Sequence, residues 1–452
     1  MYFPSPLRKA RTRRSNQFTP VMAIVNGALQ SLADIVLQPV ILLSAIVFLL
    51  GGSLYHVAGF TVASLASWAW AGSIVPPMRA LLRREYHVVI VGGIIRLVAV
   101  VAIGLIGYGL ADDSSGSFVR NLLIAYVVYQ LGSAIIGRAS ANSISGAASS
   151  ASRRGLFRNR AMTGVLVGVI GGATTWSVLG SDGTAGENAG ILLVLASIAT
   201  VAATWFLIAI PGTNRIESPA PYGNRSLAQA FGAIRSSGFR RFLFFRALLA
   251  VSAAADPFIV IYGIRELGLT LGDVGLGIAV YAAGHFAGIL IWPRWVASRS
   301  ARGPLQITSL IRLLMLIMAV SVPTIATSQL YADRFDGPEV ATRYFVAIFG
   351  LLGLVVSANN SSNQPYLLDI FPAAMGSAAI SMTNACLGAL AFGPLGAAYL
   401  VNRFSLESML YVAITLAFVA LLTSGLLVES RVRVRQRSGS RRVQRTMSRS
   451  TA

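Results

Sequence analysis

The chain contains 452 residues, of which 55% are hydrophobic and only 12% are charged, and its formal net charge is +21. A soluble protein of this length needs more charge to cover its surface, so the composition indicates a chain embedded in lipid. A single cysteine, Cys386, excludes an intrachain disulfide and a paired-cysteine metal cluster, and we expect neither a metal site nor a cofactor.

The first residues, 1–20, are basic and lack a small-residue cleavage site, so we predict a cytoplasmic tail rather than a signal peptide. From there, apolar runs of the roughly 20 residues that cross a bilayer recur to the end of the chain. We therefore predict an all-α membrane protein with twelve transmembrane helices. Six are expected at residues 21–44, 57–77, 87–110, 119–140, 161–181 and 189–210, and six at residues 243–264, 273–293, 305–328, 344–366, 376–400 and 408–428. Residues 429–452 read as a basic, disordered cytoplasmic tail.

Arginines give the orientation of these helices, because cytoplasmic loops carry an excess of basic residues. They gather in both tails and in alternate connections, whereas the intervening connections carry acids such as Asp112, Asp182 and Asp333. This distribution argues against a nucleic-acid partner. It predicts a multi-pass protein of the cell membrane with both termini cytoplasmic and with tails that bind anionic lipids. The connection after the tenth span departs from the pattern, since it carries only Asp369. Nearly all basic residues are arginines, and Lys9 is the only lysine in the sequence. This preference indicates a prokaryotic source with GC-rich DNA.

The two halves of the sequence match each other without gaps at an offset of 216 residues. The match pairs Gly52 with Gly268, Gly59 with Gly275, Gly72 with Gly288, Pro77 with Pro293, and Ile95-Arg96-Leu97 with Ile311-Arg312-Leu313. A proline and an embedded arginine triplet in one register indicate a duplication. We therefore predict two pseudo-symmetric six-helix bundles, at residues 21–210 and 242–428, joined by a cytoplasmic loop at residues 211–241. In duplicated transporters the binding site lies between the halves near the bilayer midplane.

With six plus six helices, cytoplasmic tails and a duplication, residues 20–430 resemble the major facilitator superfamily. That family carries a glycine, an acid four residues later and a basic cluster after its second span. Here the glycine is Gly72, but Pro76 stands at the acidic position, and the second-half counterpart at Gly288 also lacks the acid. The basic cluster is present as Arg79, Arg83 and Arg84, so we assign a structural or gating role to this cluster with Gly72, Pro77, Gly288 and Pro293.

Glycines are frequent in the fifth span, at Gly164, Gly168, Gly171 and Gly172, and in the eleventh span from Gly388. These helices resemble those of drug–proton antiporters in the same superfamily, although the usual proline is absent from the fifth span. The cavity helices offer few fixed charges and many aromatic and apolar groups, which favours export of a small amphipathic or hydrophobic compound.

A polar stripe runs along the first span, because Asn26, Gln30, Asp34 and Gln38 follow one another at i, i+4. An ionisable group at mid-membrane costs roughly 2.5–3.5 kcal/mol on insertion scales, so the stripe is expected to face the protein interior. Asp34 is a candidate for binding a proton or a cation, and the three amides are candidates for binding solute. The alternative is that Asp34 only pairs with an arginine or hydrogen-bonds a neighbouring helix.

The seventh and eighth spans hold two further candidates for ion coupling. Asp256 precedes Pro257 near the middle of the seventh span, where the proline bends the helix and frees a backbone carbonyl. His285 in the eighth span titrates near neutral pH. The alternatives are a local kink for Asp256 and a packing role for His285.

Amides cluster in the tenth span, at Asn359, Asn360, Asn363 and Gln364, and suit the wall of a polar cavity that hydrogen-bonds a solute. Interhelical hydrogen bonding is the alternative. The fourth span offers a counterpart in Arg138 and Asn142, where Arg138 either attracts an anionic group or extends to the cytoplasmic surface. Arg96 and Arg312 occupy equivalent places in the third and ninth spans, and we assign them a structural role.

Together these features predict a secondary transporter that moves a small solute by alternating access, coupled to an ion that we expect to be a proton. The chain lacks a phosphate-binding Gly-x-x-x-x-Gly-Lys loop, and nothing in it supports an enzyme. We expect a monomer. The alternative is a non-transporting protein on the same fold, such as a lipid scramblase, an assembly factor or a partner-binding subunit, which the missing acids four residues after Gly72 and Gly288 favour.

Overall fold

The computed structural model describes residues 6–82, 85–109, 116–147, 150–209, 234–335, 337, 339–371 and 373–429, and this part of the chain is helical throughout, without strands. The first half consists of α1 (Pro6–Val36), α2 (Leu42–Leu49), α3 (Leu54–Leu82), α4 (Glu85–Tyr108), α5 (Gly116–Ala147), α6 (Ser150–Leu179) and α7 (Ala185–Ile208). The second half consists of α9 (Ser237–Ser252), η2 (Ala253–Ala255), α10 (Asp256–Leu267), α11 (Leu271–Ser298), α12 (Arg302–Ala326), α13 (Gln329–Ala332), α14 (Glu339–Ile370), α15 (Ala373–Gly388), η3 (Ala389–Phe392), α16 (Gly393–Arg403) and α17 (Leu406–Ser424).

The helices confirm an all-α membrane protein. Ten helices of the described part are long and apolar enough to span a bilayer, or eleven if the bent α3 counts as one span. The segment expected as the first span is instead divided into α1 and α2, and the apolar part of α1, Pro20–Val36, is short. Twelve spans are reached only when α1 and α2 are counted together. At the central connection, α9 begins at Ser237, so the last residues of the expected loop 211–241 are helical.

Three of the expected spans are interrupted, and polar side chains satisfy the freed backbone groups at the first of these breaks. Between α1 and α2, the Gln38 side-chain oxygen accepts hydrogen bonds from the backbone N–H groups of Val40 and Ile41, both at 2.7 Å. The seventh span breaks at η2 before Pro257, and the eleventh breaks at η3 before Pro394. Because lipid offers no hydrogen bonds, such breaks persist only where protein supplies the missing partners.

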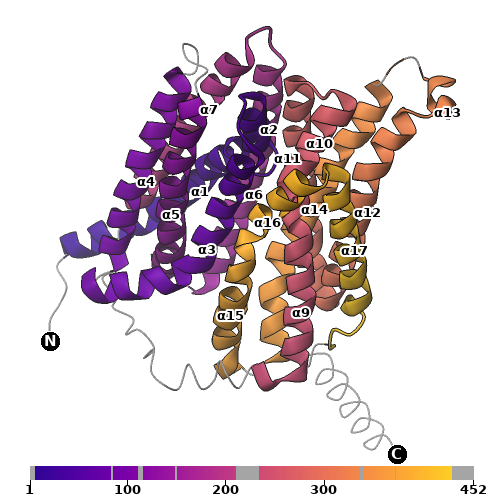
Figure 1. Ribbon diagram of the computed structural model, residues 1–452. Helices are drawn as coiled ribbons and strands as arrows, with labels where there is room; N and C mark the ends of the chain where they lie inside the picture. The colour runs from indigo at the N-terminus through magenta and orange to yellow at the C-terminus, as the bar shows by residue number, and fades with distance from the viewer. Residues whose placement is uncertain are drawn as a thin grey trace, which may run out of the picture.

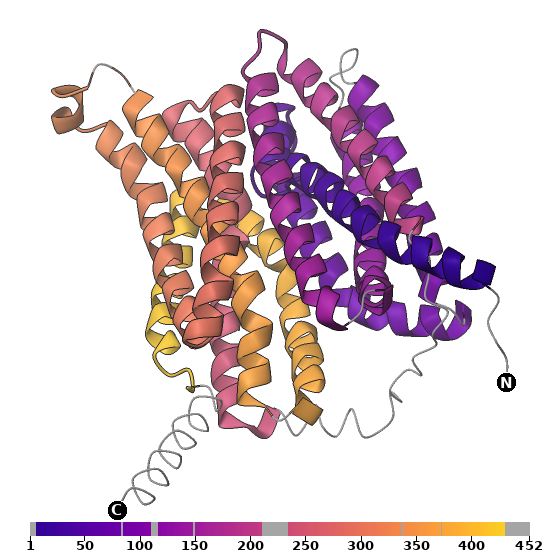
Figure 2. The same ribbon diagram turned by 180° about the vertical axis from the view of Figure 1, so that it is seen from behind.

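The two halves lie side by side (Figures 1 and 2), and α2 of the first half contacts α10 and α11 of the second. Helix α6 packs against α11, and α3 packs against α15, η3 and α16. The α6–α11 contact depends on glycine: a Cβ added at Gly172 would lie 2.8 Å from the Cα atom of Ala279, and one added at Gly275 would lie 2.8 Å from the Cα atom of Trp176. Small residues of this kind let helix backbones approach closely in membranes.

We expect Gly275→Leu to separate the halves and to lower the thermal stability of the purified protein, because the added side chain meets the α6 backbone rather than a movable side chain. Gly396→Leu is the matched control, since an added Cβ there has no neighbour within 4 Å. Equal melting temperatures for the two variants in detergent would show that the α6–α11 contact is not close.

The apolar core is shared by both halves at one end of the bundle and divided at the other. We call the end where α1 begins and α17 ends the termini end (Figure 1). At the opposite end, one cluster of buried residues joins the halves, including Val47 and Val57 of the first half with Phe258 and Tyr262 of the second. At the termini end the first half has its own cluster around Val88, and the second half has its own cluster around Phe242 and the other aromatic side chains of α9.

At the end opposite the termini end, a charged side chain of one half contacts an aromatic side chain of the other. The guanidinium of Arg265 in α10 lies 5.2 Å from the ring centroid of Phe48 in α2. In the described part of the chain, the two halves therefore meet in a continuous apolar core at the opposite end and carry separate cores at the termini end.

Candidate functional site

Asp34 lies where the shared core of the halves gives way to their separate cores. Its neighbours Ala33 and Val36 are buried at 0% and 1% exposure, but the Asp34 side chain is exposed. Along α1, Ala23 belongs to the first half's separate core, and Ile35 belongs to the shared core. Since an exposed carboxylate facing hydrocarbon is costly, we infer that Asp34 faces water in the opening between the halves.

The Asp34 carboxylate is linked to Arg96 of α4 through a glutamine. The Gln30 amide nitrogen donates to Asp34 Oδ1 at 2.6 Å, and the Gln30 oxygen accepts a short hydrogen bond from Arg96. Arg96 is 3% exposed, and its guanidinium also lies 5.5 Å from the ring centroid of Tyr129. The neutral amide of Gln30 therefore lies between the guanidinium of Arg96 and the carboxylate of Asp34 and hydrogen-bonds both.

Asn26, the first residue of the polar stripe, holds a second arginine of the first half. The Arg160 guanidinium in α6 donates to Asn26 Oδ1 at 2.8 Å, and Asn26 Nδ2 donates to the carbonyl of Ala203 at 2.7 Å. Gly27 makes room for this arginine, because a Cβ at Gly27 would lie 2.5 Å from Arg160 Cγ. Arg160 also interacts electrostatically with Asp34. Arg160 was not among the expected site residues, and its proximity to the stripe is visible only in the fold.

Gln38, the last residue of the stripe, serves the break between α1 and α2 described above. Its side chain also interacts with Tyr281 of α11 in the other half. Beside the break, the Tyr126 hydroxyl donates to the carbonyl of Leu37 at 3.2 Å, and Gln130 donates to that hydroxyl at 2.5 Å. Both amide and phenol groups therefore satisfy the backbone where the first span is interrupted.

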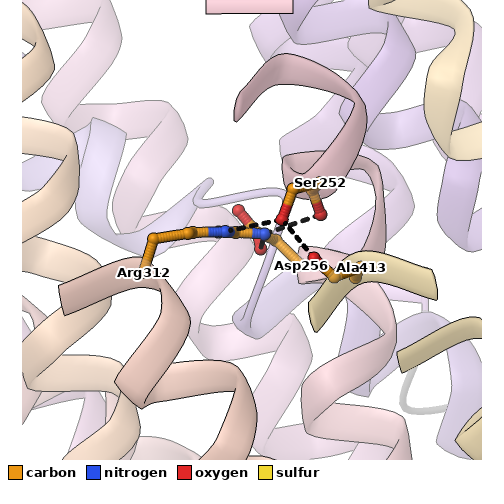
Figure 3. Close-up of polar contacts among 4 residues, drawn as sticks. All are labelled: Ser252, Asp256, Arg312 and Ala413. Carbon is orange, nitrogen blue, oxygen red and sulfur yellow. Dashed lines mark hydrogen bonds and ion pairs between the residues drawn. The ribbon is translucent and has the colours of Figure 1, made fainter. Parts of the chain in front are cut away.

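Asp256 forms a buried ion pair with Arg312 in the second half (Figure 3). The Arg312 guanidinium lies 2.5 Å from Asp256 Oδ1 and donates to the Ser252 carbonyl at 2.7 Å and to the Ser252 hydroxyl at 3.3 Å. The Ser252 hydroxyl in turn donates to the carbonyl of Ala413 at 3.0 Å. Arg312 is 2% exposed and Asp256 is 8% exposed. Thus α9, α10, α12 and α17 are tied together around one charge pair.

The two halves repeat this arrangement with one difference. Arg96 and Arg312 are equivalent in the duplication, and they contact Gln30 and Ser252, which precede Asp34 and Asp256 by four residues. The first helices of the halves are therefore related by an offset of 222, rather than the 216 that relates the later helices. In the second half the arginine reaches its carboxylate directly and both are buried, whereas in the first half a glutamine intervenes and the carboxylate is exposed.

The amides of the tenth span lie on α14 and differ in their surroundings. Asn359 Oδ1 accepts a hydrogen bond from Arg246 of α9 at 2.7 Å, and Asn363 Oδ1 is buried without a hydrogen-bond partner in the described part of the chain. Asn360 and Gln364 are exposed. In the first half, Arg138 is exposed, and its guanidinium lies near Gly72, where an added Cβ would be 3.6 Å from Arg138 Cζ. The Asn142 side chain lies outside the described residues.

His285 is half-buried at the contact between α11 and α14. Its ring stacks on that of Tyr281, with centroids 6.1 Å apart, and its Nδ1 atom is buried without a hydrogen-bond partner in the described part of the chain. The backbones of α11 and α14 approach closely here, since a Cβ at Gly353 would lie 2.6 Å from the backbone nitrogen of His285. The histidine thus occupies a tightly packed contact between two helices of the second half.

The residues expected to form the loop motif serve helix packing where they are described. Pro77 and Pro293 lie inside α3 and α11, and Gly288 brings α11 against Ser357 of α14. Arg79 lies in the last turn of α3, while Arg83 and Arg84 lie outside the described residues. Ser252 was not among the expected site residues, although its spacing from Asp256 equals that of Gln30 from Asp34.

The backbone is similar to those of solved membrane transporters. The chain is 12% identical to a mutant form of the nucleoside transporter NupG, with a TM-score of 0.64 over 91% of this chain and 100% of that one. It is 14% identical to a D-xylose–proton symporter, with a TM-score of 0.64 over 91% and 98%. No family model and no curated protein matches the sequence. At these identities the likeness shows the fold alone.

One solved protein allows two states to be compared. A bacterial homologue of the iron transporter ferroportin, 14% identical to this chain, gives a TM-score of 0.61 in its inward-facing state over 94% of this chain and 99% of that one. In its outward-facing state the TM-score is 0.57 over 90% and 99%.

Proposed function

We propose that this protein is a secondary transporter that moves a small solute by alternating access, with Asp34 as the group that binds a coupling proton. The exposed Asp34 carboxylate, in the middle of a span and at the level where the halves separate, carries this proposal. An ionisable group placed there in an open bundle is reached from one side only. When the halves rock to the other state, the same group is reached from the other side.

The Gln30 bridge gives protonation of Asp34 a structural consequence. When Asp34 is ionised, its carboxylate accepts from Gln30, which in turn accepts from Arg96. A protonated Asp34 loses the charge that attracts Arg96 and Arg160, so the polar groups between α1, α4 and α6 have a different preferred arrangement. Ion coupling requires an equilibrium between two arrangements of the protein that shifts when a proton binds, and protonation of Asp34 would supply such a shift.

We assign solute contact to the side chains that face the divided end of the bundle. On α14 these are Asn359, Asn360, Asn363 and Gln364, which offer amide donors and acceptors beyond the shared core. On the first half, Arg138 is exposed beside α3. Gln38 is assigned to the helix break, and Asp256, Arg312 and Arg96 are assigned to holding the helices of each half together.

We propose further that the termini end is cytoplasmic, as the arginine distribution predicts, and that the protein acts as a monomer in the cell membrane of a prokaryote. The basic tails bind anionic lipids in this proposal. Export of an amphipathic compound remains the predicted direction, supported by the glycine-rich α6 and α16.

The test is solute-dependent proton movement in vesicles that contain the purified protein and a trapped pH-sensitive dye. We expect a panel of amphipathic solutes to include members that change the internal pH only in vesicles with protein. A non-transporting protein on this fold would leave the internal pH unchanged with every member, and fluorescent lipid movement in the same vesicles would identify a scramblase instead.

A further inference from the structure

Two arginines within the spans are held by neutral asparagines rather than by carboxylates. Arg246 of α9 donates to Asn359 at 2.7 Å, and Arg160 of α6 donates to Asn26 at 2.8 Å. Both side chains are partly exposed. In the described part of the chain, Arg246 has no carboxylate partner, and Arg160 has only an electrostatic interaction with Asp34.

These two arginines come from opposite halves, and each lies near the repeated arginine contact of its half. The repeated contacts place Gln30 and Ser252 at equivalent positions in the duplication. Asn26, which holds Arg160, precedes Gln30 by four residues, and Arg246 precedes Ser252 by six. Asn26 and Arg246 therefore lie on the termini side of Asp34 and Asp256 in the first helices of their halves.

The charges around the opening do not balance. Arg312 is neutralised directly by Asp256, so this pair contributes no net charge. Arg96 and Arg160 both interact with Asp34, and Arg246 has no acid beside it in the described residues. Among these residues, the guanidinium groups of Arg96, Arg160 and Arg246 are therefore set against the single carboxylate of Asp34. A partly buried guanidinium with a neutral partner is costly unless an anion approaches it.

We propose that the transported solute is an organic anion whose carboxylate or phosphate oxygens bind Arg246 and Arg160. This inference rests on the proposed function and names the class of solute. Asn359 and Asn26 orient the two guanidinium groups without neutralising them, so their remaining N–H groups are free for the anion. The apolar helices around the opening accept the rest of an amphipathic molecule.

Asp34 links this anion to the proton. The groups around it are Gln30 on α1, Arg96 on α4, Tyr126 and Tyr129 on α5, Arg160 on α6 and Tyr281 on α11. An ionised Asp34 repels the anion and competes for Arg160, whereas a protonated Asp34 does neither. Proton and anion therefore bind together, and affinity for the anion falls as the pH rises through the titration of Asp34. Export of the anion then requires an outward anion gradient that exceeds the inward proton gradient.

The experiment measures binding of three anion and neutral pairs: benzoate and benzamide, succinate and succinamide, and glycerol 3-phosphate and glycerol. The full chain is held in nanodiscs of phosphatidylcholine, and thermal stabilisation is followed against ligand concentration. We expect stabilisation by at least one anion and by none of the neutral partners. Arg246→Gln and Arg160→Gln are expected to weaken that anion about tenfold or more, the size of a lost hydrogen bond to a charged group.

Arg240→Gln is the matched control, since Arg240 is exposed on the same helix as Arg246. Arg246→Lys is expected to recover part of the affinity because it keeps the charge. Stabilisation by neutral partners alone, by no member of the set, or equally in Arg246→Gln and Arg240→Gln would overturn the anion assignment. If phosphatidylglycerol stabilises the protein through Arg246 but soluble anions do not, the site binds a lipid headgroup and the assignment also fails.

Measuring transport of the same three anion and neutral pairs across vesicles distinguishes the proposed transporter function from the proposed anionic solute. If only a neutral solute is transported, the proposed transporter function holds and the assignment of an anionic solute fails. Binding of an anion through both arginines, without movement of any member across vesicles, would keep the anion site and remove the proposed function.

Discussion

Asp34→Asn is expected to abolish solute-dependent proton movement while solute exchange across the membrane continues. The asparagine preserves the shape and the hydrogen bond with Gln30 but removes the only group of α1 that we assign to the proton. The variant resembles the protonated state permanently, so the halves still rock with solute bound. The measurement compares internal pH change with equilibrium exchange of labelled solute in the same vesicles. We expect a loss of proton movement of tenfold or more, since no second group replaces the carboxylate.

The comparison variant is Asp182→Asn, which makes the same chemical change at an exposed carboxylate at the opposite end of the bundle. It is expected to behave like the unmodified protein. In Asp34→Asn, anion binding is expected to be as tight at high pH as at low pH. Unchanged proton movement in Asp34→Asn, or equal loss in both variants, would contradict the assignment of Asp34.

Asp256→Asn is expected to lower the free energy of unfolding strongly and to have little effect on solute-dependent proton movement. Removing one partner of a buried ion pair leaves an uncompensated charge, which costs roughly 3–5 kcal/mol. Arg312 is 2% exposed and is surrounded by four elements of the second half, so water does not reach it to replace the carboxylate. The measurement is the free energy of unfolding in detergent by chemical denaturation. The double variant Asp256→Asn with Arg312→Gln is expected to regain most of the loss, because neither charge is then left unpaired.

Glu407→Gln serves as the control for this change, because Glu407 is exposed and only accepts a hydrogen bond from Tyr262 at 3.3 Å. It is expected to alter stability by about 1 kcal/mol or less. A double variant no more stable than Asp256→Asn would show that Asp256 has a role apart from Arg312. Selective loss of proton movement in a stable Asp256→Asn protein would restore it as a coupling residue, as the sequence analysis expected.

The helices were largely predictable from the sequence, because a membrane span is defined by length and hydrophobicity alone. The breaks within the spans were less predictable, although Pro39 and Pro257 mark two of them. The break after the short apolar part of α1 depends on Gln38, which accepts hydrogen bonds from two backbone N–H groups. The duplication was visible at an offset of 216, whereas the first helices of the halves are related at 222. Six additional residues between the aligned segments hid the equivalence of Gln30 with Ser252.

The polar candidates could be found from the sequence, but their differences could not. Asp34 and Asp256 look alike in the sequence, since each is a lone carboxylate within a span. One is exposed and the other buried because Asp34 lies where the separate cores begin, whereas the residues next to Asp256, such as Ala255, belong to the shared core. Only the fold brings Arg160 and Arg246, in opposite halves, to neutral asparagines.

The central claim is that the halves alternate between two arrangements around Asp34. Distances between pairs of spin labels test it most directly, in a Cys386→Ser background that leaves no other thiol. One pair, at Asn159 and Ala297, reports on the termini ends of α6 and α11, and another, at Ser181 and Glu266, reports on the opposite end. The account predicts that lowering the pH, or adding a bound anion, changes the two distances in opposite directions and that Asp34→Asn removes the response to pH. A single distance at each end, unchanged under every condition, would contradict alternating access.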